Sequence, residues 1–456
     1  MTPHQYAQTH EARFVEELIE LVKIPSVSTQ PEHREDVERA ARWLIDQMDK
    51  IGIENGEIVL MPGGRCPLVY GDWLHAGPDR PTILYYAHYD VQPALKSDGW
   101  HTEPFEPVIK DGQLFARGAT DSKIHVLILL KALESLFANH DGKLPVNIKI
   151  IFEGEEESGS ENLNAFTQQH GDRLKADIAV ISDGPIISPD QPSIVGGLRG
   201  IVSFEINVKG PARDLHSGHY GGSVHNPIQA LCELVAQLHA SDGRVEVPGF
   251  YDQVRIFSDE ERAAMSLIDP IWQGEWDRVA AAPNPWGEPD YSLHERTGIR
   301  PTLELNGIWG GYTQTGVKTV LPAEATAKIT CRLVPYQNPT EILDLVEAQV
   351  KALSPPTVTV TMTRQDMGAE AVLIDYQSKP MRLAKAAYEE HWKRETALEM
   401  AGGSIPITAA FRPLVGEVVL MGFAHKGGQA HGPNENIFLS NYSRGIATVI
   451  TFLTGL

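Results

Sequence analysis

The sequence of 456 residues has little cysteine, no excess of positive charge and no long apolar run. Its three cysteines, Cys66, Cys232 and Cys331, lie far apart and form neither a disulfide framework nor a cysteine-type zinc site, which is typical of a reducing compartment. Basic residues number 39 against 60 acidic ones, so a net charge of −21 argues against nucleic acid or an anionic membrane as partner. No stretch approaches the roughly 20 apolar residues of a membrane span.

The first residues also lack the basic segment and apolar core of a secretory signal. We therefore expect a cytoplasmic protein. Hydrophobic residues make up 42% of the chain and charged residues 22%, which is ordinary for a globular protein. The length allows two or three domains, and the chain contains no internal repeat or low-complexity tract.

Helical and strand-like segments alternate from residue 9 to about 195, which predicts a mostly parallel sheet covered by helices. Examples are helices over 36–51 and 122–139 and strands over 82–88 and 146–153. After residue 200 the pattern predicts strand 201–208, helix 227–238, strand 325–333, helix 339–353 and strand 357–363. With one more strand than these, the order would be β-α-β-β-α-β, which predicts a small two-layer domain with an antiparallel sheet.

We therefore expect an α/β protein with two domains. Residues 1–198 and 372–456 would form a discontinuous, metal-binding catalytic domain. Residues 199–371 would form an inserted two-layer α+β domain that acts as a lid or in dimerisation. The segment 372–456, which contains a predicted strand over 417–421, has to pack against the segment 1–198, because both carry residues of the candidate metal site. The stretch 241–300 is rich in proline, tryptophan and acidic residues, which favours a helical insertion packed on the small domain. A lid that faces substrate or a dimer partner is the alternative.

Histidines and acidic residues follow apolar segments at five places along the chain. They are His88 with Asp90, Asp121, the acidic run Glu155–Glu157, Asp183 and His431. The carboxyl ends of parallel strands meet at one edge of a sheet, so these side chains are expected to converge there. Each alone has an ordinary explanation, as a helix cap, a solvated loop, a turn or a surface histidine. Five such places, each at the end of an apolar segment, together indicate a functional site.

Two histidines and several carboxylates, with no cysteine, suit zinc, manganese or cobalt. A two-metal site needs a carboxylate that bridges the ions and another that is free to act as a base. The adjacent Glu156 and Glu157 could divide metal binding and base catalysis between them. Asp90 lies two residues after His88 on an extended chain, so it can accept the second ring N–H of the histidine.

These motifs resemble those of the dinuclear zinc peptidases that include carnosinase-like cytosolic dipeptidases, glutamate carboxypeptidase and aminoacylase. The resemblance extends from the helical segment at Phe14 to the His431 loop. It is nearest to the carnosinase-like branch, through Asp214–Gly218, Gly221–His225, Cys331–Pro335 and Gly402–Pro406.

The resemblance implies a role for each residue of the candidate site. His88 and Asp183 would complete one zinc site, Glu157 and His431 the other, and Asp121 would bridge both. Asp90 would orient His88, and Glu156 would act first as general base and then as acid. The peptide bond after Asp121 is typically cis in this family.

The resemblance also implies substrate contacts in the inserted domain. Arg332 would hold the C-terminal carboxylate of a small peptide, assisted by Ser404 and Thr319, because a planar guanidinium suits a carboxylate. His216 would stabilise the oxyanion in the active site of a partner subunit, so a homodimer is implied. Relatives commonly carry a histidine before the last catalytic-domain helix, and the segment 366–370 has none. One substrate contact is therefore expected to differ.

The predicted function is metal-dependent hydrolysis of dipeptides or short peptides with a free C-terminal carboxylate, by a metal-bridging water that Glu156 activates. An N-acyl-amino-acid hydrolase or a carboxypeptidase with the same site is the alternative. A non-catalytic binding protein is disfavoured because every ligand and the base are retained. The expected cofactors are two divalent ions, Zn²⁺ foremost, with Mn²⁺ or Co²⁺ as alternatives. The expected partners are a small peptide and a second copy of the chain, without nucleic acid or membrane.

Overall fold

The computed structural model describes residues 1–139, 142–403 and 406–456. The chain forms two compact units. Unit 1 comprises Met1–Val195, Ile374–Leu398 and Ile407–Leu456, and unit 2 comprises Gly196–Leu373 and Glu399–Pro406. The division into a catalytic and an inserted domain, with limits at residues 198 and 372, stays a prediction. The segment Glu399–Pro406, predicted as part of the catalytic domain, groups with unit 2.

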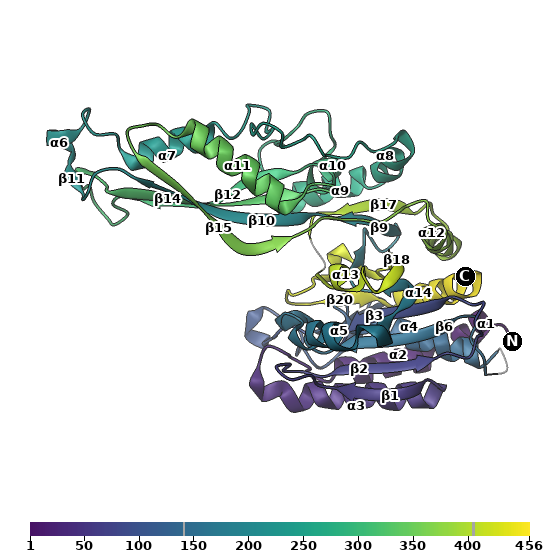
Figure 1. The fold of residues 1–456 in the computed structure, drawn as a ribbon. Helices are drawn as coiled ribbons and strands as arrows, with labels where there is room; N and C mark the ends of the chain where they lie inside the picture. Colours follow the sequence, from purple (N-terminus) through teal and green to yellow (C-terminus); the bar gives the residue numbers. More distant parts are fainter. Residues whose placement is uncertain (140–141, 404–405) are drawn as a thin grey trace. The chain divides into compact units, whose positions relative to one another are not determined.

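Among the described residues, unit 1 is organised by a run of six neighbouring strands that belongs to a nine-stranded sheet (Figure 1). Its order is β1 (Glu54–Val59), β2 (Leu68–Trp73), β6 (Asn147–Glu153), β3 (Thr82–His88), β7 (Ala176–Ile181) and β18 (Val415–Leu420). The last four strands run parallel, whereas β1 and β2 are antiparallel to their neighbours. The predicted α/β class with a mostly parallel sheet is confirmed.

Helix α4 (Lys123–Phe137) is the central helix of unit 1. Most of its residues are buried on all sides, as expected from its nearly continuous apolar sequence. It packs on β3 and is covered by four helices. These are α1 (Pro3–Thr9), α2 (Glu11–Val22), α3 (Arg34–Ile51) and α14 (Leu439–Gly455). The remaining long helices of this unit are α5 (Glu161–Leu174) and α12 (Lys379–Trp392).

Unit 2 is built on a four-stranded antiparallel sheet. Its order is β12 (Thr302–Gly310), β14 (Glu324–Leu333), β10 (Gly200–Lys209) and β15 (Thr359–Ala369). Helices α7 (Pro227–Ala236) and α11 (Pro339–Leu353) lie together against this sheet (Figure 1), with an apolar core between the two layers. The predicted β-α-β-β-α-β order and two-layer architecture are confirmed.

The stretch 241–300 contains several short helices, and its role as an insertion packed on the small domain or as a lid stays a prediction. It contains α8 (Asp259–Ser266), α9 (Asp269–Glu275), a π-helical turn (Trp276–Ala280) and α10 (Leu293–Gly298). Arg262 of α8 binds Glu295 of α10 at 2.6 Å, and Ile268 between α8 and α9 is fully buried. Trp286, by contrast, is 69% exposed.

Within the described parts of the chain, every helix is too short or too polar to cross a membrane.

Candidate metal centre

The site is assembled where three parallel strands end. In unit 1, β3 lies between β6 and β7, with His88 paired to Glu153 and Tyr86 to Ile181. His88 is the last residue of β3, the acidic run follows β6, and Asp183 follows β7. These groups therefore lie at one edge of the sheet, as the strand pattern predicted.

The other two ligand candidates arrive from loops. Asp121 lies just before α4, and the His431 loop leads into β20 (Asn436–Phe438). Strand β20 pairs with β5 (Gln113–Phe115), which places the His431 loop beside the loop of Asp121. The bond between Asp121 and Ser122 is cis, as the resemblance implied.

Two groups of side chains share the Asp121 carboxylate. In the first group, Nε2 of His88 lies 2.9 Å from Oδ1 of Asp121 and 3.5 Å from Oδ1 of Asp183. In the second, Nε2 of His431 lies 3.0 Å from Oδ2 of Asp121 and 3.3 Å from Oε2 of Glu157. The two oxygens of Asp121 thus face different histidines. This is the arrangement that a bridging carboxylate requires.

The carboxylate of Asp90 is fully buried behind this cluster. Its Oδ1 lies 3.3 Å from Nδ1 of His88, so the ring presents Nε2 to Asp121. The same carboxylate accepts the backbone N–H groups of Glu156 at 3.2 Å and Glu157 at 3.0 Å. Asp90 therefore holds both the histidine and the acidic loop, and only the first contact was predicted from the sequence.

The three acidic residues of the run 155–157 have different surroundings. The carboxylate of Glu155 is buried and accepts the backbone N–H groups of Asn162 and Arg65 at 3.2 and 3.3 Å, so it is occupied by the fold. Glu157 faces His431. Glu156 belongs to neither ligand group. This division matches the predicted assignment of Glu156 as base and Glu157 as ligand, which remains a prediction.

The donor set fits divalent cations. In each group one ligand atom per residue lies within 4.8 Å of the others. Oε1 of Glu157 is buried without a hydrogen-bond partner in the described part of the chain. Burial raises the pKa of the Glu156 carboxyl to about 7; His88 opposes this shift, whereas the neighbouring carboxylates add to it. The cluster thus combines nitrogen and oxygen donors with an excess of negative charge that cations would relieve.

A further contact in the site was not predicted from the sequence. The side-chain amide of Gln92 donates to Oε2 of Glu157 at 2.7 Å. Its position two residues after Asp90, on an extended segment, is the signal that could have identified it.

The residues predicted to contact the substrate belong to unit 2, where they occupy two separate positions. Arg332 is near the end of β14, opposite Ile201 of β10, and among the described residues no ion pair joins it to a carboxylate. The exposed His216 is in β11 (Leu215–His216), and the carbonyl of Thr319 accepts the N–H of Ser217 at 3.0 Å. Ser404 lies outside the described residues.

The two places are at opposite ends of β14. Strand β11 pairs with β13 (Val320–Leu321), which precedes the first residue of β14, Glu324. At about 3.3 Å per residue, the strand from Glu324 to Arg332 is roughly 26 Å long. Thr319 therefore lies beside His216 and far from Arg332 of the same chain, although it was predicted to assist that arginine.

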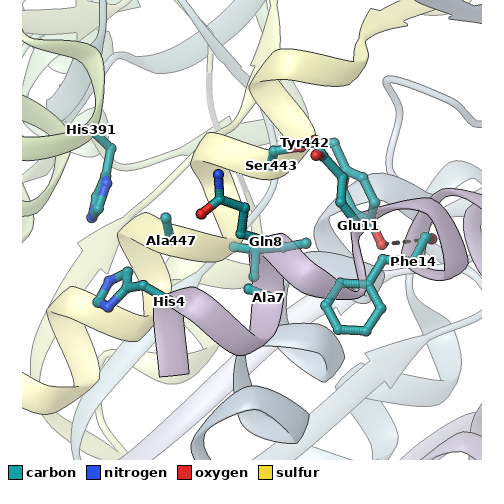
Figure 2. Close-up of a pocket in the computed structure, with 10 residues that line it drawn as sticks. His4, Ala7, Gln8, Glu11, Phe14, His391, Tyr442, Ser443 and Ala447 are labelled. Atoms are coloured by element: carbon teal, nitrogen blue, oxygen red, sulfur yellow. Dashed lines mark hydrogen bonds between the residues drawn. The ribbon is translucent and has the colours of Figure 1, made fainter. Parts of the chain in front are cut away.

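A separate pocket of about 340 Å³ in unit 1 lacks these groups. Figure 2 shows its lining residues, which come from α1, α2, α12 and α14. Its two histidines, His4 and His391, both contact the Thr451 hydroxyl, at 3.0 and 2.8 Å, and the Ser443 hydroxyl donates a hydrogen bond to the Glu11 carboxylate. None of the lining residues belongs to the predicted metal cluster. The chemistry thus points to the sheet edge and not to this pocket.

Comparison with known proteins agrees with the geometry. The model of the peptidase family M20/M25/M40 matches residues 84–455. The chain belongs to this family. The expectation of a metallohydrolase is thereby confirmed, and the match to the carnosinase-like branch is confirmed by similarity to Beta-Ala-His dipeptidases.

The chain resembles members of this family over almost its whole length. It is 32% identical to the Cys-Gly metallodipeptidase dug1 of Schizosaccharomyces pombe, over 96% of this chain and 94% of that protein. The structure of human carnosine dipeptidase 1 superposes with a TM-score of 0.74 at 30% identity, covering 99% of this chain and 98% of that one. The metallo-carboxypeptidase Sso-CP2 of Sulfolobus solfataricus superposes with a TM-score of 0.76 at 28% identity, covering 97% and 98%.

The shared position of Asp121 leads to a prediction about metal content. Asp121→Ala is expected to lose metal from both positions, whereas His431→Ala is expected to keep about one equivalent, because only the bridging residue belongs to both groups. Elemental analysis after dialysis against zinc measures this. Two full equivalents on Asp121→Ala would contradict the bridging role.

Proposed function

We propose that this peptidase hydrolyses dipeptides or short peptides with a free C-terminal carboxylate at a dinuclear metal centre. The observation that carries the proposal is the Asp121 carboxylate, whose two oxygens face separate ligand groups. Glu156 lies near both groups and belongs to neither. The relatives named as metallodipeptidases support the choice of a dipeptide substrate.

His88, Asp183 and Asp121 would hold one ion, and Glu157, His431 and Asp121 the other. When bound, the ions would lower the pKa of a water molecule and polarise the scissile carbonyl. Zinc is favoured by the mixed nitrogen and oxygen donors, with manganese and cobalt as alternatives.

Glu156 is assigned the proton transfers. Its carboxylate would take a proton from the attacking water and deliver it to the departing amine. The burial that raises its pKa to about 7 makes it a stronger base than an exposed glutamate. Asp90 would keep the imidazole of His88 oriented during this cycle.

Arg332 is assigned the substrate carboxylate, with Ser404 as a further contact. A second cation, Arg199, lies just before β10 near Arg332. Burial, together with the charge of Arg332, lowers the pKa of Arg199 to about 10. Two guanidinium groups so placed would be stabilised by an anion, such as the C-terminal carboxylate of a peptide.

We also infer a homodimer in which His216 and Thr319 of one chain serve the site of the other. The roughly 26 Å of β14 between Glu324 and Arg332 supports this, because no side chain spans such a length. Strand β12 forms an edge of the unit 2 sheet and exposes Leu305, Ile308 and Trp309 by 39, 47 and 48%. An apolar edge of this kind suits a partner chain.

A carboxypeptidase or N-acyl-amino-acid hydrolase is the second candidate. The structural similarity to the metallo-carboxypeptidase Sso-CP2 favours the carboxypeptidase, and all three activities need a cation for the substrate carboxylate. A cytoplasmic location, and the absence of nucleic acid and membrane partners, stay predictions.

Substrate length and end groups separate these activities. With zinc, manganese or cobalt added, purified protein is expected to release amino acids from dipeptides faster than from longer peptides or N-acetyl amino acids. C-terminal amidation should lower the rate at least about tenfold, because one charged contact to Arg332 is lost. Faster turnover of N-acetyl amino acids or long peptides would select the second candidate.

The role of Glu156 is tested by Glu156→Gln. This variant is expected to bind two metal ions and to lose at least about 10²-fold in turnover, because an amide cannot accept the proton. Glu161→Gln, at a side chain 55% exposed in the same acidic region, is the matched control and should retain activity. Near-normal turnover of metal-replete Glu156→Gln would exclude the assignment.

The dimer is tested by mixing two weak variants. Oxyanion donors act on the transition state, so His216→Ala should lose about 10²–10³ in turnover. Arg332→Ala should mainly raise KM. After subunit exchange, a mixed dimer has one site with both residues, and activity should partly return.

In the control experiment, the double variant His216→Ala/Arg332→Ala is used in place of the His216→Ala variant. A mixture of this double variant with Arg332→Ala leaves no site with both residues and should stay inactive. If verified exchange between the single variants restores nothing, His216 does not act across the interface.

A further inference from the structure

A buried ion pair joins the two loops that carry Asp121 and His431. Arg117 and Glu435 are 2% and 0% exposed, and Nη1 of the arginine lies 2.6 Å from Oε2 of the glutamate. Neither residue is among the predicted metal ligands. The pair lies in unit 1, where β5 and β20 bring the two loops together.

The Glu435 carboxylate fixes the backbone that leads to Asp121. Its Oε1 accepts the N–H groups of Thr120 at 2.8 Å and Asp121 at 2.9 Å. Its Oε2 accepts the N–H of Gly118 at 3.0 Å in addition to the guanidinium of Arg117. Four donors thus surround one charged acceptor, which leaves Glu435 committed to this loop.

The guanidinium of Arg117 reaches the other ligand-bearing segments. Its Nη2 donates to the carbonyl of His431 at 3.1 Å and to that of Pro93 at 3.4 Å. Pro93 follows Gln92, whose side chain holds Glu157. The guanidinium also lies over the ring of Trp100, 5.4 Å from its centroid. One ionic network therefore holds the backbone of the Asp121 and His431 loops and also contacts Pro93, next to Gln92.

We propose that Glu435 and Arg117 are positioning residues that set how Asp121 and His431 face each other, and thereby the affinity of both metal positions. Asp121 can bridge only if its two oxygens keep a fixed direction toward His88 and His431. Glu435 holds the amide of Asp121 itself, and Arg117 holds the carbonyl of His431. The inference rests on the proposed dinuclear function but concerns residues outside its ligand set.

The test is Glu435→Gln in the full-length protein, with zinc affinity as the readout. Glutamine keeps the shape, but its amide nitrogen cannot accept the N–H groups that one carboxylate oxygen receives. Binding of both zinc equivalents should weaken about 10–100-fold, the usual effect of losing a group that orients a ligand. Competition with a chromophoric chelator measures both affinities without any peptide substrate.

A purely structural role is separated by a matched variant. Glu134 of α4 is also a largely buried glutamate, and it pairs with two cations, Arg13 and Lys131. Glu134→Gln should lower the Tm of the metal-free protein and leave both zinc affinities unchanged. If Glu435→Gln lowers the Tm in the same way while both zinc affinities stay at the parental value, the proposal is overturned.

A second variant covers the case that Glu435→Gln does not fold. Arg117→Lys keeps the charge beside Glu435 but lacks the Nη2 group that donates to the carbonyl of His431. Binding of one zinc equivalent should therefore weaken more than binding of the other. Unchanged affinities would again overturn the proposal. Parental protein that binds no zinc would overturn both this inference and the dinuclear function, whereas two tight equivalents in the parent and in both variants would overturn this inference alone.

Discussion

The site depends on one carboxylate facing two histidines from distant parts of the chain. His88 ends a central strand of the sheet, whereas His431 belongs to a loop close to the C-terminal helix. Asp121 lies between them because β20 pairs with β5 and because Glu435 holds the backbone of the Asp121 loop. Around this carboxylate the fold buries further acidic groups, and burial raises the pKa of Glu156 to about 7. Such a cluster is electrostatically unfavourable without cations, so metal binding and the stability of this region are expected to be coupled.

Unit 2 carries the features on which the proposed homodimer rests. Its long strand β14 separates the segment of His216 and Thr319 from Arg332. A substrate small enough to be a dipeptide cannot contact both ends of this strand in one chain. The same unit exposes an apolar sheet edge at β12. Both features support the proposed homodimer, in which each active site would take one end of unit 2 from each chain.

Much of this organisation could be predicted from the sequence, because it depends on local patterns. The strand over 82–88 and the helix over 339–353 have the predicted limits, since apolar runs and an Asn–Pro helix start define them. The convergence of His88, the acidic run and Asp183 follows from the rule that parallel strands end at a common edge. The Arg117–Glu435 pair could not be predicted, because it requires the pairing of β5 with β20, which are far apart in the sequence. The separation of Thr319 from Arg332 likewise depends on the length and register of β14, where resemblance alone had grouped the two residues.

The proposed bridging of two metal ions by Asp121 is tested most directly by anomalous diffraction from crystals of the zinc-loaded protein, with data collected on both sides of the zinc absorption edge. A bridging Asp121 predicts two anomalous peaks about 3.5–4 Å apart. One peak should lie beside His88 and Asp183 and the other beside Glu157 and His431, with one oxygen of Asp121 on each. A single peak, or two peaks of which only one contacts Asp121, would contradict it.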